Sequence, residues 1–77
     1  GFETLPRRIF LPSGRRKLLD EATAKDVQSH IVMLRKRFLN DPKIQQMERV
    51  LELIEKHNAE KPSITWAKVK AIEMRGR

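Results

Sequence analysis

The chain has 77 residues and no cysteine, so we expect one small domain over residues 1–77, without disulfides or thiolate metal sites. Lys and Arg number 17 against 10 Asp and Glu, and the formal net charge of +7 suggests a polyanionic partner. No apolar run approaches the roughly 20 residues of a membrane span, and the first four residues lack the basic and apolar regions of a signal peptide. We therefore predict a cytoplasmic location, no membrane partner and, from Gly1 in place of Met, a processed or excised chain.

The N-terminal part of the sequence predicts an arm over residues 1–7, followed by a β-hairpin. Residues 8–11 are a β-prone run, and residues 12–14 (Pro-Ser-Gly) are typical of a turn, because proline presets φ and glycine tolerates positive φ. Residues 16–19 can return as the second strand. An isolated hairpin is only marginally stable in water, so we expect the hairpin over residues 8–20 to pack on helices.

Two amphipathic helices are predicted over residues 23–59. The first begins at the N-cap Thr23, with Asp26 three residues later as a variant of the capping box, and Asp41 and Pro42 start the second. Because the connection is short, the helices should run antiparallel. Their apolar stripes are then predicted to pair Val27 with Ile54, Ile31 with Leu51, Leu34 with Met47 and Phe38 with Ile44.

A third helix is predicted over residues 63–74, capped by Ser63 or Thr65. The elements together predict a mostly α fold, in which an N-terminal β-hairpin packs on an antiparallel αα-hairpin and a C-terminal helix follows. The apolar residues of the third helix are spread around its axis, so this helix is expected to be wedged between other elements or to meet a partner.

The first two helices also carry more apolar surface than one partner element can cover. A homodimer could bury this surplus by closing a four-helix bundle, and another protein could cover it equally well. We therefore predict a homodimer or a second protein partner, with an interface formed by Val32, Leu39, Leu53 and Trp66.

Catalysis and metal binding are poorly supported by the residue types present. Three glycines cannot form a phosphate-binding loop, and the serines lie in no catalytic motif. His30 and His57 are the only histidines, and no ligand spacing joins them to acids in a zinc-site pattern. We expect a protein that is not an enzyme and that needs no metal and no cofactor.

Basic residues gather toward the two ends of the chain, and we predict that they contact nucleic acid. The N-terminal group lies in a segment with few acids, where a basic β-ribbon can enter a groove or straddle phosphates; it comprises Arg7, Arg8, Arg15, Arg16 and Lys17. The C-terminal group lies on the third helix, whose start resembles that of a recognition helix; it comprises Lys68, Lys70 and Arg75. The cations Arg35, Lys36 and Arg37 are instead expected to face acids of the second helix.

One loose pattern resembles known sequences. Gly14-Arg15-Arg16, then Leu19-Asp20-Glu21-Ala22-Thr23, then Asp26 and the helix with Ile31 and Leu34, is similar to short, largely uncharacterised proteins encoded by bacteriophages and mobile elements of high-GC bacteria. The resemblance covers roughly residues 8–55 and identifies no functional residues. It implies a small phage or prophage regulator or accessory factor.

Two functions therefore remain open from the sequence. The first is a non-catalytic, nucleic-acid-binding accessory or regulatory protein, for which we favour DNA over RNA. The alternative is an adaptor or assembly factor whose helical faces bind another protein, with the positive charge serving only to keep the chain in solution.

Overall fold

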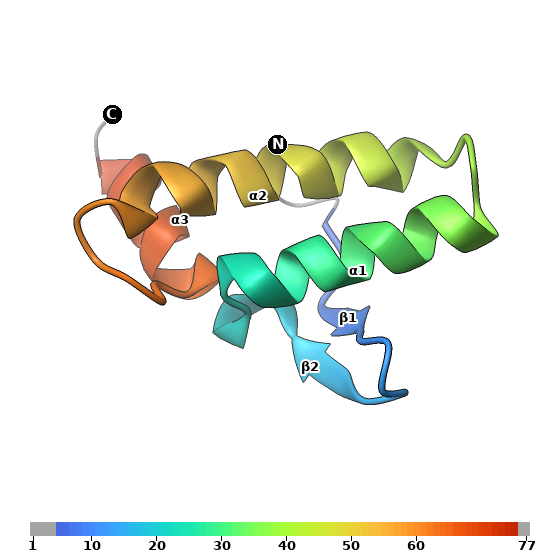
Figure 1. Cartoon of the computed structure of the whole chain (residues 1–77). Helices are drawn as coiled ribbons and strands as arrows, with labels where there is room; N and C mark the ends of the chain where they lie inside the picture. The colour runs from blue at the N-terminus through green and yellow to red at the C-terminus, as the bar shows by residue number, and fades with distance from the viewer. Residues whose placement is uncertain (1–4, 76–77) are drawn as a thin grey trace.

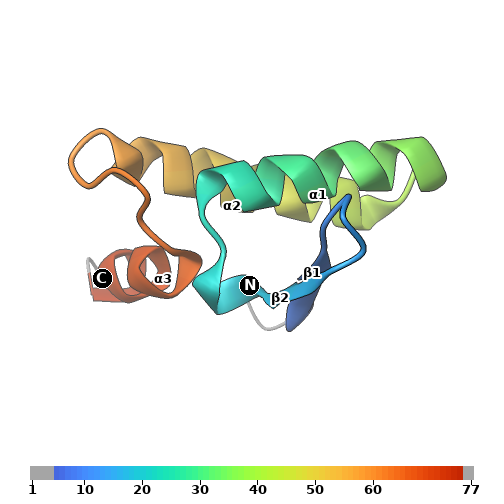
Figure 2. The ribbon, with the colours of Figure 1, turned by 60° about the horizontal axis from the view of Figure 1, so that its bottom comes forward.

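The computed structural model describes residues 5–75 and has the mostly α fold that the sequence predicts. In chain order the elements are β1 (Arg8–Phe10), β2 (Arg16–Leu18), the short 3-10 helix η2 (Leu19–Glu21), α1 (Ala24–Arg37), α2 (Pro42–Asn58) and α3 (Trp66–Arg75). Figure 1 shows α1 and α2 side by side and antiparallel. Figure 2 shows the β-hairpin and α3 on one side of this pair, toward its opposite ends. Most of the predicted N-terminal arm lies outside the described residues.

The β-hairpin forms where its turn residues predict it. Strands β1 and β2 pair antiparallel, with Ile9 opposite Lys17 at the centre of the ladder. The turn closes through a 2.9 Å hydrogen bond from the Gly14 N–H to the Leu11 carbonyl. Gly14 has φ +87°, a conformation that an L side chain would strain, so glycine is the residue that this turn requires.

Helix α1 begins as its capping residues predict. The Thr23 backbone N–H donates a hydrogen bond of 3.2 Å to the Asp26 carboxylate, and the capping box is complete. At the start of α2, Asp41 Oδ1 accepts from the Lys43 N–H at 2.9 Å, and Pro42 occupies the first turn. These side chains satisfy backbone donors that a helix start leaves without intrahelical partners.

The core between α1 and α2 follows the predicted stripes except at Leu51 and near the connecting loop. Val27, Ile31, Leu34, Met47 and Ile54 are buried, whereas Leu51 is only half-buried. The predicted burial of Phe38 against Ile44 is wrong, because Phe38 is 53% exposed. Helix α1 ends at Arg37, and Phe38 leaves the helical conformation with φ −136° and ψ 75°, so its side chain no longer continues the apolar stripe.

Helix α3 covers the apolar surface of α2 that the sequence analysis assigned to a partner. It packs on both α2 and η2. Leu53 and Trp66 are buried in the chain's own core together with Val50 and Val69. The assignment of Leu53 and Trp66 to a protein interface is therefore corrected: α3 itself fills that position. Of the four predicted interface residues, Val32 and Leu39 remain exposed.

The segment before α3 is longer than predicted, since the helix starts at Trp66. The first helical hydrogen bond runs from the Val69 N–H to the Thr65 carbonyl, so Thr65 and not Ser63 stands at the start. Ser63 has φ +63°, the left-handed conformation that reverses the chain after α2. The Trp66 N–H donates to the Ala22 carbonyl at 2.9 Å, which ties α3 to the segment between η2 and α1.

We expect Ile54→Ala to lower the free energy of unfolding by about 2–5 kcal/mol, because it removes a fully buried side chain from the core. Leu39→Ala is the matched control, since Leu39 is 81% exposed and its truncation should cost less than about 0.5 kcal/mol. Urea unfolding followed by circular dichroism measures both values. Equal losses in the two variants would contradict this description of the core.

Candidate nucleic-acid interface

The β-hairpin has two chemically different faces because side chains alternate along each strand. In β1, Ile9 is buried between exposed Arg8 and Phe10, and in β2, Lys17 is half-buried between exposed Arg16 and Leu18. Ile9 and Lys17 therefore share the inner face of the hairpin. Two arginines and two apolar residues form what we name the hairpin outer face: Arg8, Phe10, Arg16 and Leu18.

Phe10 and Arg16 are in contact on the hairpin outer face. Backbone hydrogen bonds join Leu19 to Arg7 and Leu11 to Arg15, each at 2.9 Å. Hydrogen-bonded and non-hydrogen-bonded pairs alternate in antiparallel strands, so Phe10 and Arg16 form a non-hydrogen-bonded pair, in which side chains approach most closely. The Arg16 Cζ lies 5.1 Å from the centroid of the Phe10 ring, a cation–π contact that holds both groups on this face.

His30 of α1 covers the outer edge of β1 at Phe10. The same alternation directs the Phe10 N–H and C=O away from β2, and His30 Nδ1 lies 3.2 Å from that nitrogen and 3.0 Å from that oxygen. In the neutral ring, Nδ1 accepts from the N–H or donates to the C=O, according to the tautomer. Burial lowers the pKa of His30, and the hydrogen bond to the Phe10 backbone offsets only part of this decrease. His30 therefore fixes β1 on α1.

Lys17 does not belong with the other hairpin cations. Its Nζ lies 2.7 Å from the Asp26 carboxylate on α1, so Lys17 has an acidic partner although its own segment contains few acids. The physical reason is the alternation, which directs Lys17 toward α1. Burial alone would raise the pKa of Asp26, but hydrogen bonds from Lys17 and Thr23, with the Lys17 charge, hold that pKa below its ordinary value.

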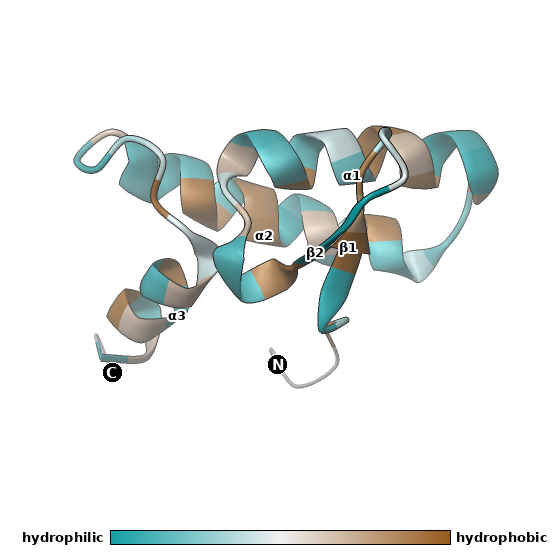
Figure 3. Cartoon of the chain, turned by 90° about the horizontal axis from the view of Figure 1, so that it is seen from below, coloured by the Kyte–Doolittle hydropathy of each residue, from teal (hydrophilic) through white to brown (hydrophobic). Residues whose placement is uncertain are grey.

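The remaining cations of the hairpin are exposed and unneutralised within the described part of the chain. Arg8, Arg15 and Arg16 are all exposed. Among residues 5–75, the acidic groups that form ion pairs bind other bases, and none of these three arginines has an acid within 4 Å. Figure 3 shows the hydrophilic residues of β2 beside the apolar residues of β1. The hairpin therefore presents positive charge next to an exposed aromatic ring.

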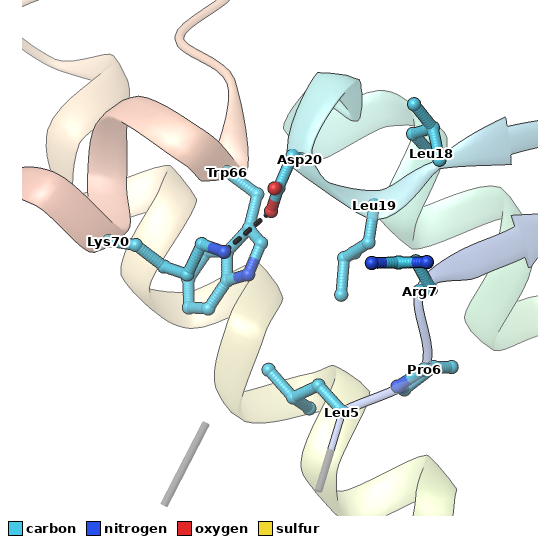
Figure 4. A pocket seen from close by; sticks show the side chains of 8 residues that line it. All are labelled: Leu5, Pro6, Arg7, Leu18, Leu19, Asp20, Trp66 and Lys70. Carbon is cyan, nitrogen blue, oxygen red and sulfur yellow. Dashed lines mark ion pairs between the residues drawn. The ribbon is translucent and has the colours of Figure 1, made fainter. Parts of the chain in front are cut away.

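The C-terminal cations lie toward the other end of the molecule, and one of them, Lys70, is paired with an acid. Lys70 Nζ is 2.6 Å from Asp20 Oδ1 on η2, an ion pair that Figure 4 shows at the edge of a pocket of about 350 Å³. Arg7 and the buried Trp66 line the same pocket. Lys68 and Arg75 are exposed on α3. The predicted contact residues therefore form separate groups on the hairpin and on α3.

The mid-chain cations behave only partly as predicted. Arg35 pairs with Glu48 of α2, as the antiparallel register predicts. Lys36 and Arg37 are exposed at the C-terminal end of α1, and neither forms an ion pair within residues 5–75. For these two, the prediction that the acids of the second helix would neutralise them is wrong, because only Arg35 reaches Glu48.

A second pocket, which the sequence analysis did not identify, lies between β1, the end of α1 and the loop before α2. We name it the Phe groove; its volume is about 440 Å³ and its apolar lining consists of Pro6, Phe10, Met33, Leu34 and Phe38. The polar residues around it are Arg8, His30, Arg37, Asp41 and Lys43. The alternation in β1 was the available signal, since it places Arg8 and Phe10 on one face. Phe38 was not predicted to line a pocket because the sequence pattern assigned it to the core.

The described residues offer little support for other kinds of site. Within residues 5–75, no group of three His, Asp or Glu side chains could hold a metal ion, and no helix is both long and apolar enough to cross a bilayer. Comparisons with protein-family models, with curated proteins and with solved structures gave no match.

The buried His30 predicts a pH dependence of stability. The pKa of His30 in the folded state lies below the ordinary value of 6.5. The contribution of neutral His30 to the free energy of unfolding is therefore fully present above pH 6.5 and is lost as the pH falls toward the folded-state pKa. We expect the free energy of unfolding to decrease on mild acidification below 6.5, and His30→Gln to weaken this dependence. His57→Gln is the control. Urea midpoints at neutral and mildly acidic pH test this, and an unchanged dependence in His30→Gln would contradict it.

Proposed function

We propose that this chain is a non-catalytic nucleic-acid-binding accessory protein that contacts phosphates through its β-hairpin. The observation that carries the proposal is the exposure of Arg8, Arg15 and Arg16 on one hairpin, without an acidic partner among residues 5–75. Unneutralised arginines are suited to phosphate because the planar guanidinium donates several hydrogen bonds in a fixed geometry. We also propose that the protein is cytoplasmic and requires no metal and no cofactor.

The hairpin shape favours DNA as the partner. A two-stranded β-ribbon fits the major groove of B-form DNA, whereas the major groove of A-form RNA is too deep and narrow for side chains to read. Arg15 and Arg16 lie at the tip and Arg8 lies beside the opposite end of the ladder, so the arginines are spread along the ribbon. A role as a regulator or accessory factor of a phage or mobile element would suit such a domain and remains part of the proposal.

A second candidate function is protein binding, and the exposure of two predicted interface residues favours it. Leu39 is 81% exposed and Val32 is 47% exposed, although both are large apolar side chains. Contact of these residues with a second copy would give the predicted homodimer, and contact with another protein would give an adaptor. This candidate is weaker than the first, because Leu53 and Trp66 no longer contribute to the exposed surface.

The homodimer makes a separate prediction. Leu39→Asp should shift the chain toward the monomer, because it places a charge in the proposed contact while leaving the core intact. Met74→Asp is the control, since Met74 is also exposed but lies on α3. Light scattering over a range of concentrations measures the mass. A wild-type monomer mass at every concentration would remove the homodimer from the proposal.

For the nucleic-acid proposal, we expect Arg15→Ala/Arg16→Ala to weaken binding to all DNA sequences together. Phosphate contacts are a sequence-independent electrostatic contribution, and each one lost should lower the slope of log affinity against log salt by about one. Titrations of labelled duplex DNA at two salt concentrations measure this slope. Circular dichroism checks that the variant is folded.

The matched control is Lys36→Ala/Arg49→Ala, which removes the same charge from exposed positions on α1 and α2. Its loss of affinity should be clearly smaller, because neither residue belongs to the hairpin or lines the Phe groove. Equal losses in the two double variants would show that net charge alone drives binding. Absence of any binding at low salt would rule out the proposed function and leave the protein-binding candidate.

A further inference from the structure

We propose that the Phe groove binds an unpaired base of single-stranded DNA, with the flanking phosphates on the surrounding arginines and lysine. This inference rests on the proposed function and deepens it, since it adds to the phosphate contacts of the hairpin a site for a base from a single-stranded region of the DNA. It is carried by two exposed aromatic rings, by the charges around them and by the contacts that hold one of the rings in place.

The first observation concerns the aromatic rings. Two of the chain's three phenylalanines line this groove, and each is about half exposed: Phe10 at 50% and Phe38 at 53%. Exposed aromatic rings of this kind are the surfaces on which the bases of a single strand stack. In a duplex the bases already stack on one another, so the rings favour a strand whose bases are free.

The second observation is the charge around the groove. Arg8, Arg37 and Lys43 line it, and Asp41 is the only acid among its described lining residues. The Asp41 carboxylate is already engaged, because its Oδ1 caps α2 by accepting from the Lys43 N–H at 2.9 Å. The groove therefore combines an apolar lining with a net positive rim, which is complementary to a flat base linked to phosphates.

The third observation is that Phe10 is held in place before any ligand binds. Its backbone meets His30 Nδ1 at 3.0–3.2 Å, and the Arg16 guanidinium lies over its ring. Arg16 is not among the residues that line the groove, whereas Phe10 is, and Phe10 is 50% exposed. A ring that is already ordered loses less conformational freedom on binding, which favours affinity. A volume of about 440 Å³ lies within the range of small-ligand sites.

The test uses two labelled oligonucleotides of equal length: an oligothymidylate and an abasic strand with the same sugar–phosphate backbone. The two carry the same phosphates, so any difference in affinity is due to the bases. We expect the wild type to bind the oligothymidylate more tightly by about 5- to 150-fold, as stacking of one base on an aromatic ring implies. Fluorescence anisotropy at low salt measures both dissociation constants.

The decisive variant is Phe10→Leu/Phe38→Leu, which keeps apolar side chains in the groove but removes both rings. It should bind the two strands with nearly equal affinity, whereas the control Leu39→Ala should keep the wild-type preference. Both Phe positions are half exposed, so the variant should fold, and circular dichroism confirms it. If the leucine variant retains the preference for bases, the inference is wrong.

Other outcomes separate this inference from the proposed function. If the wild type binds the two strands equally and Arg15→Ala/Arg16→Ala weakens both, the hairpin contacts phosphates and the groove binds no base. If Phe10→Leu/Phe38→Leu weakens binding to a duplex as much as binding to the oligothymidylate, the two rings do not serve an unpaired base and the inference is also overturned. If no nucleic acid binds but an acidic amphipathic peptide does, both proposals fail and the groove is a protein-binding site.

Discussion

The attachment of the β-hairpin to α1 determines which side chains this protein presents. Three contacts of different kinds make this attachment: Ile9 is buried in the core, His30 meets the Phe10 backbone, and Lys17 pairs with Asp26. Because strand side chains alternate, burying Ile9 places Arg8 and Phe10 on the opposite face. A slip of one residue in the ladder would exchange the two faces and bury the arginines, so the register and the surface chemistry are inseparable.

The availability of a cation in this chain depends on its local partner more than on the net charge. Lys17, Arg35 and Lys70 are each paired with an acid from another element, namely Asp26, Glu48 and Asp20 respectively. These ion pairs join the hairpin to α1, α1 to α2, and α3 to η2, respectively. The unpaired arginines of the hairpin and the cations around the Phe groove adjoin one another through Arg8, which belongs to both. Exposed cations without an acidic partner among residues 5–75 therefore include those of the hairpin and of the Phe groove, and also others elsewhere, such as Lys68 and Arg75 on α3.

Local signals in the sequence predicted the elements well, because capping and turn residues act over a few positions. Thr23, Asp26 and Asp41 mark the helix starts, and Gly14 marks the turn. Predictions that depend on distant packing failed: Leu53 and Trp66 were assigned to a partner because periodicity does not show that α3 folds back on α2. Phe38 failed because the apolar period continues one residue beyond the helical backbone. The residues of the Phe groove come from three separate segments, so no continuous stretch of sequence predicts the groove. The alternation of side chains in β2, by contrast, could have predicted that Lys17 faces α1.

The position of His30 also affects how this small sheet can grow. An unpaired strand edge can accept a strand from another molecule, and many proteins prevent this with charges or covering groups. At Phe10, the imidazole occupies the edge of β1, so a further strand cannot pair there without displacing it. The β2 edge is three residues long and carries Arg16 and Lys17. The sheet is thus protected against edge-to-edge association on one side by a ring and on the other by short length and charge, which suits a hairpin that must remain exposed.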